Sequence, residues 1–219
     1  MSSARRLNLD AIETSLRGVQ TNFSVINSTL STPRDPLSDC VLERLMLGYR
    51  QVDALLAAGV DPFAPGSSKR ILELNVLVLC GAHQALRGEC TKLVKATGQR
   101  FYETGDGGIE ALVDWVRSMQ GESIWRRAGS AYIHLLSQPQ LFIEGNHRTG
   151  ALIMSWMLAR AGEPPFVLSV DNAKAYFDPS TVAKNSRKHT LRMILERPKL
   201  VKRFADLLKQ ESEREHRLG

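Results

Sequence analysis

Residues 142–150 read FIEGNHRTG, and they run directly into ALIMSWMLA at residues 151–159. The second stretch is apolar on every side, which predicts a buried helix that begins at Thr149. The start of a buried helix carries free N–H groups and a positive dipole end. Gly145 lets a ligand approach the backbone there and Arg148 adds positive charge, so the stretch predicts a phosphate-binding turn.

Glu144 indicates a cation at the same place, because a carboxylate beside phosphates is repelled unless a metal ion lies between them. Mg²⁺ favours one or two carboxylates together with phosphate oxygens, so the local pattern predicts a metal–nucleotide site. A plainer interpretation stays open on residue types alone. In it, Asn146 takes a left-handed turn, Thr149 caps the helix, and Arg148 pairs with a carboxylate.

The rest of the chain has helical spacing of its apolar residues almost throughout. This predicts an all-α fold, with Ser38 or Asp39 capping the second helix and helices over residues 10–30, 41–56, 69–86, 109–119, 123–137, 149–161, 184–195 and 200–214. Residues 97–108 differ, since they alternate weakly and end in Gly105-Asp106-Gly107-Gly108, which predicts a strand or a small β-hairpin. We expect an extended piece at 166–170, and a turn followed by the start of a capped helix at 171–179.

Composition bounds the class of protein. The 219 residues are 43% hydrophobic and 24% charged, as in ordinary soluble globular domains. The net charge of +6 is scattered and no aromatic residues interleave with the basic ones, so we expect no nucleic-acid partner. No apolar run is long enough to span a membrane. Three cysteines without a CxxC pair, and a start without an apolar leader, predict a cytoplasmic protein; they are Cys40, Cys80 and Cys90.

Residues 140–151, QLFIEGNHRTGA, resemble the motif of the Fic family, including its Doc branch. That motif reads His, Pro, Phe, any residue, Asp or Glu, Gly, Asn, Gly or Lys, Arg, two further residues and often Arg. The resemblance covers roughly residues 70–165. It implies a Fic-like helical bundle with residues 1–68 as an N-terminal helical extension, 69–180 as the core, and 181–219 as C-terminal helices.

The resemblance also implies a set of site residues. Phe142 would anchor the loop in the core, and Glu144 would bind Mg²⁺. The phosphates of ATP, the co-substrate, would lie against nucleotide-binding residues Gly145, Asn146, His147 and Arg148. The family moves AMP from ATP to a Ser, Thr or Tyr hydroxyl of a protein. The protein target would pair with a β-hairpin flap that contains Arg100, Phe101, Tyr102 and Glu103.

The motif departs from the family where catalysis begins. Gln140 stands at the position of the family's general base, and an amide cannot accept a proton near neutral pH. Losing a positioned base costs about 10²–10⁴-fold in rate. His147 replaces the second glycine, where it could accept a proton or bind phosphate as a cation. His134 lies six residues before Gln140, about 9 Å away along a helix, and is expected to be a packed helix residue.

Three hypotheses follow. The first is a Fic-type adenylyltransferase with an impaired or altered site. The second is a degenerate Fic domain that binds a nucleotide or peptide without turnover, and the third is Doc-like phosphate transfer. Leu141, for the family's proline, and Ala151, for its last arginine, are further departures. The sequence shows no inhibitory helix motif, no P-loop, no dinucleotide fingerprint and no zinc spacing. It is compatible with a homo-oligomer.

Overall fold

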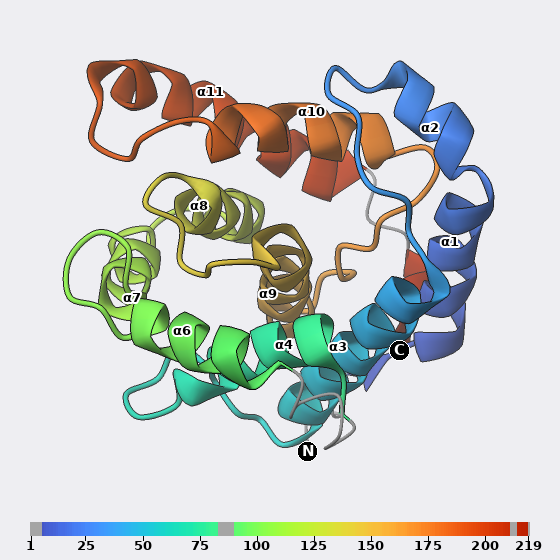
Figure 1. The fold of residues 1–219 in the computed structure, drawn as a ribbon, viewed down its shortest axis with the longest axis horizontal. Helices are drawn as coiled ribbons and strands as arrows, with labels where there is room; N and C mark the ends of the chain where they lie inside the picture. The colour runs from blue at the N-terminus through green and yellow to red at the C-terminus, as the bar shows by residue number, and fades with distance from the viewer. Residues whose placement is uncertain (1–5, 83–89, 211–213, 219) are drawn as a thin grey trace.

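The fold is built around one buried helix, α9 (Asn146–Ala161). The computed structural model describes residues 6–82, 90–210 and 214–218. In Figure 1, α9 lies at the centre, with α8 (Ile124–Leu136) on one side and α3 (Asp39–Ala57) and α4 (Lys69–Cys80) on the other. Twelve of the residues of α9 are buried, as its apolar sequence predicts.

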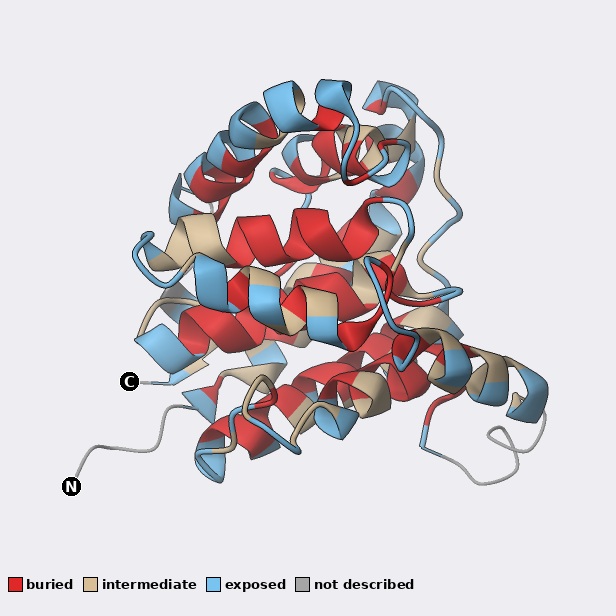
Figure 2. Cartoon of the chain, turned by 90° about the vertical axis from the view of Figure 1, so that its left-hand side faces the viewer, coloured by how far each residue is buried: buried red, intermediate tan, exposed pale blue. Residues whose placement is uncertain are grey.

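The outer helices cover this centre. On the α8 side lie α7 (Ile109–Ser118), α10 (Ala173–Lys184) and α11 (Leu191–Gln210). On the other side α1 (Leu9–Thr21) packs on α3 and α6 (Thr91–Phe101) contacts α4, while α2 (Phe23–Thr29) reaches α10. Figure 2 shows the resulting gradient, with buried residues on the inner helices and exposed residues on the outer faces. One large core cluster contains residues from Leu7 to Leu208.

The all-α prediction is confirmed, and the structure also contains a small antiparallel β pairing. The two strands are β1 (Arg6–Leu7) and β2 (Arg217–Leu218), which follows the short 3₁₀ helix η1 (Arg214–His216). They join the two ends of the described chain. Among the described residues, no helix is long and apolar enough to cross a membrane.

The hairpin predicted at residues 97–108 was wrong. Residues up to Phe101 belong to α6, and turns follow it until α7 begins at Ile109. The helix has its own amphipathic spacing, with Thr97 and Phe101 buried four residues apart. The weak alternation over six residues was too short to outweigh that spacing.

Helix boundaries near the C-terminus were also wrong. Residues 185–190 are not helical, and α10 occupies the stretch from Ala173 that was predicted only as a turn and a helix start. Pro198 lies inside α11 and does not end it. It is exposed, between Met193 and Leu200, which are both buried, so packing on either side keeps the helix continuous while the freed carbonyl faces water. Of the helix predicted at 69–86, residues 83–86 lie outside the described residues.

Candidate functional site

The loop between α8 and α9 carries the residues predicted for the site. It leaves α8 at Ser137, whose extended backbone ends the helix, and returns at Gly145. Leu141 and Phe142 are both buried, and the ring of Phe142 stacks on Phe101 with 5.7 Å between ring centroids. The predicted role of Phe142 as the anchor of the loop is confirmed.

Asn146 closes the loop with its side chain. Its Oδ1 accepts from the Phe142 N–H at 3.0 Å, and its Nδ2 donates to the Phe142 carbonyl at 2.8 Å. Nδ2 also lies 3.4 Å from Oε1 of Gln140. The amide is buried and engaged on both sides, so Asn146 positions the loop with its side chain and has only its backbone N–H to offer a phosphate.

Gly145 forms the start of α9 in the left-handed conformation, at φ +75°. An added Cβ would lie 2.9 Å from Nδ2 of Asn75 and 3.1 Å from the side chain of Leu79. Asn75 is fully buried on α4 and donates to the Glu144 carbonyl at 2.9 Å and to Oγ1 of Thr149 at 3.0 Å. Gly145 is therefore required both by backbone conformation and by close packing against α4.

Two details of this corner differ from the sequence analysis. Thr149 does not cap the helix, because α9 begins three residues earlier and Thr149 is buried in its first turn. Asn75 was not predicted as a site residue. Its signal was present, since it is a single amide inside the apolar run of residues 75–80, and such a residue is placed there to hold a partner.

The first turn of α9 has no side-chain cap. The first N–H groups of a helix have no intrahelical partner. In α9, the first backbone hydrogen bond runs from the Thr149 N–H to the Gly145 carbonyl. Within residues 6–82, 90–210 and 214–218, the N–H groups of Asn146, His147 and Arg148 have no hydrogen-bond partner, which leaves them to a ligand or to solvent. Together with the helix dipole they make this turn attractive to an anion.

Glu144 lies beside this turn with an exposed side chain, and its carboxylate takes part in no hydrogen bond or ion pair within the described part of the chain. Its charge acts on Arg148, where it partly opposes the lowering of the Arg148 pKa by burial and by Arg44. Across residues 6–82, 90–210 and 214–218, the structure has no group of three or more His, Cys, Asp or Glu side chains that could enclose a metal ion. A single free carboxylate does fit Mg²⁺ whose remaining ligands are phosphate oxygens and water.

Arg148 is engaged through one of its nitrogens. Nη1 donates to the Val78 carbonyl at 2.5 Å, and Arg44 donates to the next carbonyl, that of Leu79, at 2.6 Å. Both arginines thus hold the C-terminal end of α4, where a cation is favoured by the helix dipole. Burial, and then the charge of Arg44, lower the pKa of Arg148, yet a guanidinium stays protonated at neutral pH. No other hydrogen bond or ion pair of Arg148 occurs in the part of the chain that the structure describes, so its other donors remain for a ligand.

His147 is held in one tautomer by its neighbours. Nη1 of Arg34 lies 3.4 Å from Nε2, and a guanidinium can only donate, so Nε2 is the acceptor. The proton on Nδ1 then donates to Oη of Tyr132 at 2.9 Å, and Tyr132 donates onward to Oγ of Ser180 at 2.8 Å. Ser180 completes the series by donating to the Tyr176 carbonyl.

This environment keeps His147 neutral. Burial, followed by the charges of Arg34 and Lys184, lowers its pKa from 6.5 to about 3. It is therefore uncharged near neutral pH and is a weak base. His134, predicted to be a packed residue, is buried against Trp115, and this prediction is confirmed.

Gln140 is fixed by both of its ends. Its side-chain Nε2 donates to the Leu136 carbonyl at 3.0 Å. Its main-chain carbonyl accepts from Nε and Nη2 of Arg100 at 2.9 and 2.8 Å. Lys188 holds the preceding residue by donating to the Pro139 carbonyl at 2.9 Å. The start of the loop is thus clamped by two cations from different parts of the chain.

The residues predicted for the target flap do lie beside the loop, but they form no strand. Arg100 clamps Gln140, Phe101 is fully buried, and Tyr102 and Glu103 are exposed in the turn after α6. Glu103 pairs with Arg100. Residues 97–108 therefore present no strand edge to a target, and pairing by β-augmentation has no structural basis there.

A cavity of about 300 Å³ lies beside the first turn of α9, where His147 and Arg148 line it. Its wall combines aliphatic side chains with aromatic ones, among them Tyr49, Phe166, Tyr176 and Phe177. Its polar edge consists of Arg34, Asp35, His147 and Arg148. Nothing in the sequence had indicated it, because residues 32–36 read only as a break between helices. Residues 34–36 of that segment form part of the cavity wall, together with the first two turns of α9.

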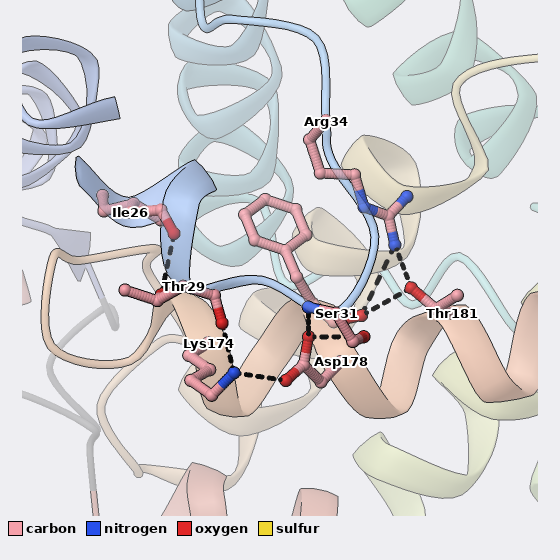
Figure 3. Close-up of polar contacts among 8 residues, drawn as sticks. Ile26, Thr29, Ser31, Arg34, Lys174, Asp178 and Thr181 are labelled. Carbon is pink, nitrogen blue, oxygen red and sulfur yellow. Dashed lines mark hydrogen bonds and ion pairs between the residues drawn. The ribbon is translucent and has the colours of Figure 1, made fainter. Parts of the chain in front are cut away.

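Contacts with α10 hold the segment there (Figure 3). Lys174 binds the Thr29 carbonyl and pairs with Asp178 at 2.9 Å, and Asp178 accepts from both N and Oγ of Ser31. Arg34 donates to Oγ1 of Thr181 at 2.6 Å. These contacts place the Arg34 guanidinium beside His147.

No protein-family model and no curated protein matched this chain.

Proposed function

We propose that the protein binds the phosphates of a magnesium–nucleotide complex at the start of α9, and that it is a Fic-type domain in which transfer of AMP is strongly impaired. One observation carries the proposal. The buried helix α9 begins without a side-chain cap, directly after a left-handed glycine and beside a carboxylate that has no partner in the described chain.

Three kinds of group would hold the ligand. The N–H groups of Asn146, His147 and Arg148, aligned with the helix dipole, would bind phosphate oxygens. The free donors of Arg148 would bind a terminal phosphate in a charge-assisted way. Glu144 would hold Mg²⁺, which supplies charge neutralisation between the phosphates when it is bound.

Slow transfer follows from the lack of a base. A target hydroxyl that attacks the α-phosphorus must lose its proton, and Gln140 cannot take it. The Nδ1–H of His147 donates to Tyr132, and its Nε2 accepts from Arg34. Its pKa near 3 makes it a poor proton acceptor. The structure therefore favours nucleotide binding over turnover.

A slow transferase is the second candidate, favoured by the free carboxylate of Glu144 in company with Arg148. Either AMP transfer, with pyrophosphate leaving, or Doc-like phosphate transfer would use these two residues. Mass spectrometry of a lysate treated with the protein and ATP separates the outcomes: a gain of AMP on a target, a gain of phosphate, or neither. The proposal expects neither for the natural chain, and AMP transfer after Gln140→His.

Calorimetric titration with ATP, with and without Mg²⁺, tests the binding itself. Glu144→Gln should remove the dependence on Mg²⁺, and Arg148→Gln should weaken binding about 10- to 100-fold, the effect of one lost charged hydrogen bond. Glu110→Gln is the matched control, because Glu110 is an exposed carboxylate in the first turn of α7. The proposal would be contradicted if ATP did not bind, or if Glu110→Gln changed the affinity for ATP as much as the site variants do.

A further inference from the structure

A second cavity lies at the opposite end of α9. It has a volume of about 540 Å³, within the range of roughly 300–1,000 Å³ that small-molecule sites occupy. Its apolar wall contains Phe63, Val116, Trp156 and Met157, and the rings of Phe63 and Trp156 lie 6.0 Å apart. The residues of α9 that line this cavity run from Trp156 to Ala161, so at 1.5 Å per residue they lie about 16 to 24 Å along the helix from Gly145.

Two side chains that line this cavity have buried donors without acceptors. The indole N–H of Trp156 has no hydrogen-bond partner among the described residues, although Trp156 is only 5% exposed. The Nε–H of Arg127 is likewise buried, and nothing in the described part of the chain accepts from it. An indole nitrogen can only donate, and a buried donor without an acceptor is destabilising, so both groups would gain from an acceptor.

The charges around the cavity are mainly positive. Arg117, Arg127 and Arg160 line it, whereas Asp61 is the single acidic residue among the described residues that do so. One oxygen of Asp61 accepts from the Phe63 N–H at 2.8 Å. Arg117 has a distant partner, Asp114 at 3.6 Å, and neither Arg127 nor Arg160 has an ion pair in the described parts of the chain.

We propose that this cavity is a binding site for a small organic anion with an aromatic or other apolar body. The ring would lie against Trp156 and Phe63, and a carboxylate, sulfonate or phosphate ester would accept from Arg127, Arg160 and the Trp156 indole. An apolar wall with a few convergent donors is the usual composition of a small-molecule site. The site is separate from the nucleotide site proposed at the start of α9.

The probe for the test is 8-anilino-1-naphthalenesulfonate, which joins an aromatic body to one anion. Its fluorescence is titrated against the full chain, with the uncharged N-phenyl-1-naphthylamine as the matched probe. Arg160→Gln and Trp156→Phe should each raise the dissociation constant of the sulfonate about tenfold, the equivalent of one hydrogen bond. The uncharged probe should not respond to Arg160→Gln.

Arg148→Gln is the control, because it changes the other end of α9. The proposal is overturned if the sulfonate does not bind, if both variants bind it as tightly as the natural chain, or if Arg148→Gln weakens it equally. Thermal unfolding checks that each variant is folded. Arg160 is exposed, so Arg160→Gln keeps the test decisive even if Trp156→Phe disturbs the core.

Discussion

Replacing Gly145 by alanine tests how the loop is held against α4, and Gly66→Ala is a closely matched control. The two glycines have nearly the same positive φ, +75° and +76°. An added Cβ at Gly66 meets nothing within 4 Å, while at Gly145 it would lie 2.9 Å from Nδ2 of Asn75. Both substitutions therefore carry the same backbone strain, and only Gly145→Ala adds a steric clash.

The shared part is the cost of a left-handed alanine, about 1–2 kcal/mol. The additional part at Gly145 comes from Asn75, which must move and give up its hydrogen bonds to the Glu144 carbonyl and to Thr149. Two such bonds contribute about 1–3 kcal/mol together. We therefore expect Gly145→Ala to lower the free energy of unfolding by that amount beyond Gly66→Ala.

Urea denaturation of the three proteins, followed by circular dichroism, measures the difference from the midpoints and slopes. If the two alanine variants lose the same stability, within about 0.5 kcal/mol, the buried contact between Gly145 and Asn75 does not exist as described.

Three further predictions concern the surroundings of the loop. Burial, followed mainly by nearby cations, depresses the pKa values of His134 and His147 to about 3, below the unfolded value of 6.5, so their contribution to stability is complete above pH 6.5 and is lost as the pH falls toward 3. At pH 5 each histidine should lower the free energy of unfolding by about 2 kcal/mol. His134→Phe should reduce the slope of that free energy, measured by urea denaturation, against pH. Tyr132→Phe should destabilise by about 1–3 kcal/mol in urea, because the Nδ1–H of His147 loses its acceptor; an unchanged midpoint would refute the hydrogen bond between Tyr132 and His147. Arg100→Met should cost about 1.5–3 kcal/mol in the same assay, whereas an effect no larger than that of the exposed Arg117→Met would refute the clamp on Gln140.

The strongly patterned parts of the fold were predictable from the sequence. The apolar run at 151–159 could only be a buried helix, and Ser38 does cap α3, accepting from the Val41 N–H. The weakly patterned parts were not. Residues 173–184 are mostly small or polar, with Tyr176, Phe177 and Val182 as their large apolar residues and with an internal Pro179. The helix they form owes its stability to packing on α8 and α11.

The candidate site shows the same limit. The motif placed Gly145, Glu144 and Arg148 at one helix start, because neighbours in sequence are neighbours in space. It could not reveal that Arg34 lies beside His147, more than one hundred residues away, or that Lys188 holds Pro139. Those contacts depend on tertiary packing, and they decide which groups near the loop are free to act on a ligand.

The most direct test of the central proposal is an NMR titration of the ¹⁵N-labelled chain with Mg²⁺ and adenylyl imidodiphosphate, an ATP analogue that resists hydrolysis. We predict that the largest shifts occur at the backbone amides of residues 144–149, whose N–H groups start α9. Unmoved amides in that turn, or shifts concentrated at residues 156–161 at the other end of the helix, would contradict it.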